Sequence, residues 1–125
     1  MLKPEYDVVA IGNAMVDIFA HVTEDFILRR AEENGIKKGA MNLIDSELAV
    51  DIHARMKDPV TKPGGAACNM TAGFRSFGGK CAFIGKTGKD AFGEVFAKSL
   101  REAGIHYQTR PFEGATNMAT GRSLI

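Results

Sequence analysis

The sequence predicts an α/β protein with a mainly parallel sheet flanked by helices. Short apolar runs alternate along the chain with longer segments in which apolar residues recur every three or four positions. The runs at 7–11 and 81–84 are almost continuously apolar, which is typical of strands buried on both faces of a parallel sheet. Residues that favour helix starts and stops, such as Thr23 and Gly35, bound the longer segments.

The first half of the chain is expected to hold three strands and two helices. In chain order these are a strand at 7–11, a strand at 15–22, a helix at 24–34, a strand at 37–44 and a helix at 46–57. The second strand follows from a partial alternation of apolar and polar residues. Thr23 and Asp45 are suitable N-caps for the two helices. A turn at Gly39 would lead into the strand at 37–44.

The second half continues the alternation. We expect a helix at 66–77, a strand at 81–84, a loop at 85–89, a helix at 91–103, and strands at 105–112 and 118–125. The helix at 66–77 is predicted to bury one stripe formed by Ala66, Met70, Gly73, Phe74 and Phe77. Asp90 is the expected N-cap of the helix at 91–103, and Gly104 is its expected stop.

Composition excludes several classes of protein. At 125 residues the chain is one domain by size, with 45% hydrophobic and 25% charged residues and a net charge of +1. No basic stripe favours nucleic acid as a partner, and no apolar run approaches the length of a membrane helix. The N-terminus lacks a signal-peptide pattern. Cys68 and Cys81 lie in apolar surroundings, so we expect buried, reduced thiols in a cytoplasmic protein.

The stretch at 62–79 is the first candidate for a binding site. Gly64 and Gly65 lack Cβ atoms, so the backbone there can approach a ligand closely. The helix start that follows has backbone N–H donors without partners and the positive end of a dipole. Asn69 lies one turn further on. This combination suits a polar, hydroxyl-rich or anionic ligand, although a tight turn followed by a helix would read the same way.

Asn13 and Asp17 follow the first strand. Ligands of open α/β sheets bind beyond the carboxyl ends of the strands, and an ionised carboxylate can accept two hydrogen bonds from a vicinal diol. The alternative is that Asp17 is a cap and Asn13 a turn residue. Met41 is either core filler or part of a strand that covers a ligand.

Two familiar nucleotide motifs fail. Gly85-Lys86-Thr87 resembles the end of a P-loop, but Lys80 stands where the first glycine is required, and the intervening residues are predicted to be strand. The segment from Gly12 lacks the second and third glycines of a dinucleotide fingerprint.

Four motifs stand in order: GNAMVD at 12–17, PGGAACN at 63–69, FIGKTGKDAFG at 83–93 and TG at 120–121. In order and spacing this series resembles the N-terminal part of the ribokinase-like carbohydrate kinases, the PfkB family, over nearly the whole chain. The opening motif is most similar to the adenosine kinase branch.

The resemblance implies transfer of phosphate from ATP, with magnesium, to a primary hydroxyl of a sugar or nucleoside. By motif position, Asp17 would hold ribose hydroxyls, and the sugar pocket would be completed by Gly64, Gly65 and Asn69, with Asn13 beside it. Strands near 16–22 and 38–44, the latter including Met41, would form a small β lid that excludes water. An exposed lid edge could pair with the lid of a second subunit.

The family's second signature, G-A-G-D, carries the catalytic base and is absent from the sequence. Residues 1–125 therefore resemble only the acceptor-binding and lid part of such a kinase, with the catalytic and nucleotide-binding parts expected downstream. We expect no catalytic residue in this chain, and no turnover by this chain alone. A non-enzymatic ligand-binding module that keeps only the acceptor half is the alternative. Adenosine, another nucleoside, ribose and a ketose all remain open as acceptors.

Overall fold

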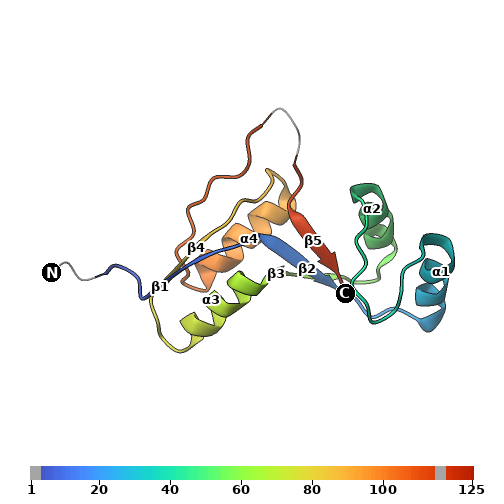
Figure 1. Cartoon of the computed structure of the whole chain (residues 1–125), viewed down its shortest axis with the longest axis horizontal. Helices are drawn as coiled ribbons and strands as arrows, with labels where there is room; N and C mark the ends of the chain where they lie inside the picture. Colours follow the sequence, from blue (N-terminus) through green and yellow to red (C-terminus); the bar gives the residue numbers. More distant parts are fainter. Residues whose placement is uncertain (1–3, 115–117) are drawn as a thin grey trace. The chain divides into compact units, whose positions relative to one another are not determined.

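The computed structural model describes residues 4–114 and 118–125. Its helices and strands are β1 (Val8–Ile11), β2 (Met15–Phe19), α1 (Glu24–Asn34), α2 (Ser46–Arg55), β3 (Val60–Gly64), α3 (Ala66–Ser76), β4 (Cys81–Ile84), α4 (Ala91–Glu102) and β5 (Gly121–Leu124) (Figure 1). The chain divides into two compact units, of which the first contains residues 1–18 and 61–123 and the second contains residues 19–60 and 124–125.

The first unit contains a parallel strand pair, which confirms the α/β class. β1 pairs with β4 in a register that runs from Val8 opposite Cys81 to Ile11 opposite Ile84, and α3 packs on both strands. Behind β4 lies an aromatic cluster in which the ring of Phe83 is 5.7 Å from that of Phe96. Phe96 anchors α4 to this cluster and is fully buried.

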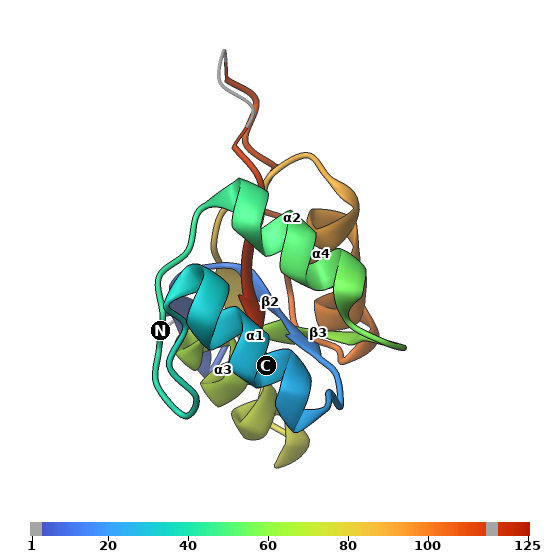
Figure 2. The same ribbon diagram turned by 90° about the vertical axis from the view of Figure 1, so that its right-hand side faces the viewer.

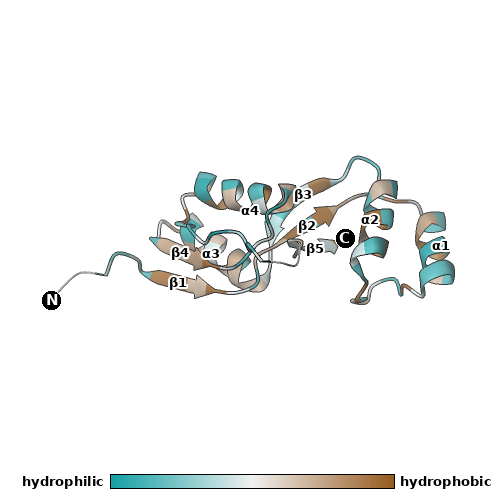
Figure 3. Cartoon of the chain, turned by 90° about the horizontal axis from the view of Figure 1, so that it is seen from above, coloured by the Kyte–Doolittle hydropathy of each residue, from teal (hydrophilic) through white to brown (hydrophobic). Residues whose placement is uncertain are grey.

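The expected burial of β1 on both faces is wrong for the described structure. Ala10 is buried, but Val9 is 53% exposed and Ile11 is 77% exposed, and the apolar colour of β1 is plain in Figure 3. Among the described residues β1 has a strand neighbour only on its β4 side. The apolar run therefore indicated a strand correctly, but this structure covers only part of its surface.

The predicted buried stripe of the helix at 66–77 is also wrong. α3 buries Cys68 and Thr71, whereas Met70 is 50% exposed and Phe77 is 92% exposed. Thr71 can be buried because its hydroxyl donates to the carbonyl of Ala67 at 2.7 Å. Apolar periodicity missed this face because its polar member satisfies its hydrogen bond within the helix.

The other strands form a three-stranded sheet in the order β3-β2-β5. The strand expected at 15–22 is shorter, since β2 ends at Phe19. β3 was not predicted as a strand because it contains Pro63, which cannot donate to a ladder. Its position at the edge of the sheet removes that objection.

The strand expected at 37–44 is absent. Asn42 instead holds this segment as a loop, because its side chain accepts from the N–H of Lys37 and donates to the carbonyls of Lys37 and Ala40, at 2.8–3.0 Å. The strand expected at 105–112 is reduced to one bridge between His106 and Ala82. The last expected strand, 118–125, is β5 at Gly121–Leu124.

Helix ends follow the sequence closely. Thr23, Asp45 and Asp90 accept from backbone N–H groups of the first turns of α1, α2 and α4, at 3.2, 2.8 and 2.8 Å. Gly35 ends α1 in the left-handed conformation, with φ 68°. The capping predictions for these three helices are therefore confirmed.

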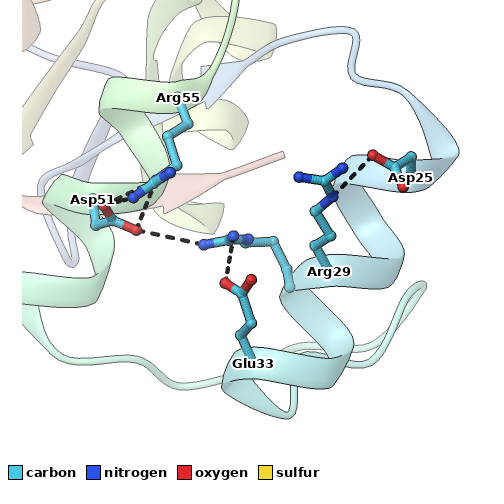
Figure 4. A network of polar contacts seen from close by, with 6 residues as sticks. Asp25, Arg29, Glu33, Asp51 and Arg55 are labelled. Atoms are coloured by element: carbon cyan, nitrogen blue, oxygen red, sulfur yellow. Dashed lines mark hydrogen bonds and ion pairs between the residues drawn. The ribbon is translucent and has the colours of Figure 1, made fainter.

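The second unit packs α1 beside α2 (Figures 1 and 2). The guanidinium of Arg30 joins the two helices, because it contacts Glu33 on α1 at 2.6 Å and Asp51 on α2 at 3.4 Å. Asp51 also pairs with Arg55 at 2.8 Å (Figure 4). No helix among the described residues has the length and hydropathy needed to cross a membrane.

Candidate functional site

Asp17 lies in the middle of β2, between two fully buried neighbours. Val16 and Ile18 are both 0% exposed, while Asp17 is half-buried. Because side chains alternate along a strand, the burial of Val16 and Ile18 directs Asp17 to the opposite face. β2 itself is flanked by β3 and β5, so its backbone is held on both sides.

The glycine pair lies against Asp17 and Asn13, one glycine on each. A Cβ atom on Gly64 would overlap the carboxylate of Asp17. Gly65 has φ 92°, a conformation that L side chains rarely adopt, and a Cβ there would lie 2.8 Å from the carbonyl oxygen of Asn13. Both positions therefore require glycine, because only a residue without a Cβ lets the backbone of 64–65 lie against Asp17 and Asn13.

The start of α3 completes this group. Gly65 is the N-cap residue, and no side chain caps the helix. The first N–H groups of α3 thus have no capping side chain, in contrast to those of α1, α2 and α4. Asn69 is one turn into the helix and is exposed, and its own N–H donates to the carbonyl of Gly65 at 2.9 Å.

Electrostatics ties the group to the buried thiol of Cys68. Burial, together with the smaller effect of the negative charge of Asp17, raises the pKa of Cys68 to about 11. Cys68 and Cys81 are each 2% exposed, and neither forms a disulfide. The thiol at this site is therefore neutral at ordinary pH and is not a nucleophile.

Four of the six site residues named from the sequence come together: Asn13, Asp17, Gly64 and Gly65. Asn69 is adjacent through its bond to Gly65. Met41 belongs to the second unit, lies in a loop rather than a strand, and is 88% exposed.

Met15 is a site residue that the sequence reasoning missed. Its Cγ atom lies 3.4 Å from the position of a Cβ on Gly65. Met15 is two positions before Asp17, and residues two apart share one face of a strand. Strand alternation could have placed it beside Asp17.

A carboxylate can accept hydrogen bonds from two hydroxyls, and backbone N–H groups beside it can donate to a third polar atom. Such an arrangement binds and orients a hydroxyl-rich molecule. Among residues 4–114 and 118–125 no group of three His, Cys, Asp or Glu side chains is placed to hold a metal ion.

These features form a candidate site for a polar small molecule, made by the middle of β2 and by the glycine pair at the end of β3 and the start of α3. The profile of the pfkB family carbohydrate kinases matches residues 7–120, and the chain belongs to this family.

Similar proteins include both nucleoside and sugar kinases. The adenosine kinase of Sinorhizobium meliloti is 45% identical with a TM-score of 0.78 over 97% of this chain. A probable sugar kinase of Rhizobium etli CFN 42 is 40% identical with a TM-score of 0.77 over 95% of this chain. Probable fructokinase-5 of Arabidopsis thaliana is 36% identical over 63 residues, or 50% of this chain.

The chain spans 35% and 34% of the two solved structures and 19% of the Arabidopsis protein.

Proposed function

We propose that this chain forms the acceptor-binding part of a kinase that transfers the γ-phosphate of ATP to a primary hydroxyl of a nucleoside, with adenosine as the first candidate. The observation that carries the proposal is the close approach of Gly64 to Asp17 and of Gly65 to Asn13, at the start of α3, which no side chain caps. Family membership and the 45% identity to an adenosine kinase support it.

In this proposal Asp17 accepts hydrogen bonds from two neighbouring hydroxyls of the acceptor sugar. The backbone at 64–65 and the amide of Asn69 contact its remaining polar atoms. Phosphoryl transfer depends mainly on positioning and on stabilisation of charge. The role of these residues is therefore to fix the orientation of the acceptor.

ATP with magnesium is the donor that family membership suggests, and it would supply the transferred phosphate. The G-A-G-D signature, which carries the catalytic base in the family that the chain resembles, is absent from the sequence. We therefore expect the 125-residue chain to show no ATP-dependent phosphorylation of adenosine or ribose in a coupled assay, and turnover above background would contradict this.

Replacement of Asp17 tests the proposal directly. We expect Asp17→Ala in the whole protein to weaken acceptor binding by about ten- to a hundredfold, because hydrogen bonds to a charged group contribute about 1.5–3 kcal/mol. Isothermal titration with adenosine measures this. Asp25→Ala is the matched control, since Asp25 is an exposed carboxylate on α1. Unchanged affinity in Asp17→Ala would remove Asp17 from the site.

A ketose or ribose is the second candidate acceptor, because the curated relatives that match this chain include probable fructokinases of Arabidopsis thaliana. A panel of adenosine, ribose and fructose in the same titration separates the two candidates. Binding of one acceptor without any phosphorylation by the whole protein would instead favour the non-enzymatic binding module.

A further inference from the structure

The start of β5 is joined to the start of α4 by a compact set of hydrogen bonds. The backbone N–H of Thr120 donates to Oδ2 of Asp90 at 2.8 Å, and its hydroxyl donates to Oδ1 at 2.6 Å. Both oxygens of one carboxylate therefore hold one residue. Thr120 is 3% exposed, so these bonds are shielded from water.

The Thr120 hydroxyl is used in both directions. It accepts from the N–H of Gly88 at 3.0 Å, and its single proton serves the closer acceptor, Asp90. Asp90 also accepts from the N–H of Gly93 at 2.8 Å as the N-cap of α4. One carboxylate thus caps a helix and holds the residue that precedes a strand.

That strand lies beside the strand that carries Asp17. β5 neighbours β2 in the sheet order β3-β2-β5. A Cβ on Gly121, the residue after Thr120, would lie 3.2 Å from the Cβ of Met15. A second contact also joins β5 to α4, because the guanidinium of Arg122 on β5 lies 5.7 Å from the ring centre of Phe92 on α4.

We propose that Asp90 and Thr120 are positioning residues for the acceptor site, because they fix β5 to α4 and so hold the neighbouring strand that carries Asp17. The inference rests on the proposed function of Asp17. Neither residue contacts the glycine pair in the described structure, so each acts through β5 and β2. Supporting residues that do not touch the ligand determine how accurately a binding carboxylate is held in position.

The test uses a matched pair at residue 120 of the whole protein. Thr120→Val keeps the shape of the side chain and removes the hydroxyl, whereas Thr120→Ser keeps the hydroxyl. We expect Thr120→Val to raise the KM for the acceptor about tenfold with little change in the KM for ATP, since small displacements of positioning groups are costly. Thr120→Ser should stay close to wild type.

Asp90→Asn is the second variant, because an amide nitrogen would face the N–H of Thr120 in place of one accepting oxygen. Asp45→Asn is its control, since Asp45 caps α2 through one hydrogen bond to Leu48. We expect weaker acceptor binding in Asp90→Asn but not in Asp45→Asn. Wild-type acceptor affinity in both Thr120→Val and Asp90→Asn would overturn the inference.

Amide hydrogen exchange separates failure of this inference from failure of the proposed function. Exchange at residues 121–124 should be faster in Thr120→Val than in Thr120→Ser, whichever ligand the protein binds. Unchanged exchange would show that the two residues do not hold β5, which overturns the inference. Absence of binding by the wild-type protein to every acceptor on the panel would overturn the proposed function instead.

Discussion

Gly64 and Gly73 differ in whether the structure leaves room for a side chain. Gly64 has no room for a Cβ because the carboxylate of Asp17 occupies that position. Gly73, within α3, has no atom within 4 Å of its Cβ position. Glycine is thus needed at one position for close approach, and at the other it only lowers helix stability.

We expect Gly64→Ala and Gly73→Ala to act in opposite directions. Gly64→Ala should displace Asp17 and abolish measurable acceptor binding. Gly73→Ala should leave binding unchanged and stabilise the protein by about 0.5–1 kcal/mol. Urea unfolding and acceptor titration measure the two effects. Normal binding by a folded Gly64→Ala variant would show that Asp17 is not confined by the glycine pair.

The thiol of Cys68 reports the charge of Asp17 without any ligand. The pKa of Cys68 is raised by burial and by Asp17, so Asp17→Asn should lower it and speed alkylation of Cys68 at pH 9, measured in a Cys81→Ala background. Asp25→Asn should have no effect. Equal rates in Asp17→Asn and Asp25→Asn would place the carboxylate further from the thiol than the structure does.

The same shift has a consequence for stability with a definite sign. The folded pKa of Cys68 is about 11, above the value of about 8.5 for an exposed thiol. The neutral, buried thiol therefore contributes in full to the free energy of unfolding below pH ~8.5. This contribution is lost as the pH rises toward the folded pKa. Cys68→Ala should flatten the decline of melting temperature above that pH.

At the scale of elements, Arg30 is the main polar link between α1 and α2. It is 7% exposed, and its Nε has no hydrogen-bond partner among the described residues. Its partners Glu33 and Asp51 are much more exposed, at 57% and 43% for their side chains. Truncation of Arg30 would therefore leave no carboxylate buried, and the aliphatic stem contributes much of its packing.

We expect Arg30→Ala to lower the free energy of unfolding by about 1–3 kcal/mol and Arg30→Met to lie within about 1 kcal/mol of wild type. Arg29→Ala is the control, because its ion pair with Asp25 is exposed on both sides. Urea-unfolding curves compare the three variants. Equal losses in Arg30→Met and Arg30→Ala would show that the ion pairs, and not the stem, join the helices.

Helices and their ends could be read from the sequence, whereas the strands could be read only in part. The strand expected at 37–44 is absent, the one expected at 105–112 is a single bridge, and β3 was not expected. Helix caps are local, so Thr23, Asp45 and Asp90 could be identified from sequence alone. Strand pairing is not local, and the strand containing Pro63 depends on β2 as its partner. The loop at 37–42 was missed for another reason, since the local side-chain bonds of Asn42 to Lys37 and Ala40 replace a strand there. The motifs named Asn13, Asp17, Gly64 and Gly65, which the structure places together. Met15 and Thr120 could be related to them only through the register of β2 with its neighbours.

At the scale of the whole molecule, the described structure leaves an apolar surface on the β1–β4 pair. Val9 and Ile11 lie on one face of β1, and Ile84, opposite Ile11, is 46% exposed. Exposed strands of this kind favour association with another chain. The surface predicts that the 125-residue chain is marginally stable or self-associates.

Sedimentation velocity of that chain should show association that increases with concentration, and Ile11→Thr should reduce it while keeping a β-branched side chain in the strand. Val50→Thr is the control, because Val50 is similarly exposed, at 55%, on α2. A cooperative thermal melt from a monomer at all concentrations would show that the β1–β4 surface does not drive association.

The pairing of β1 with β4 also sets an order of events during synthesis. Asp7 and Lys80 hydrogen-bond across a separation of 73 residues. At translation rates of about 5–20 residues per second, β1 is synthesised roughly 4–15 s before β4, its pairing partner. The contacts of α1 with α2 lie within 19–60 and are complete before β4 is made. The α1–α2 part of the second unit is therefore synthesised first, and the nascent chain carries an unpaired apolar strand until β4 is made.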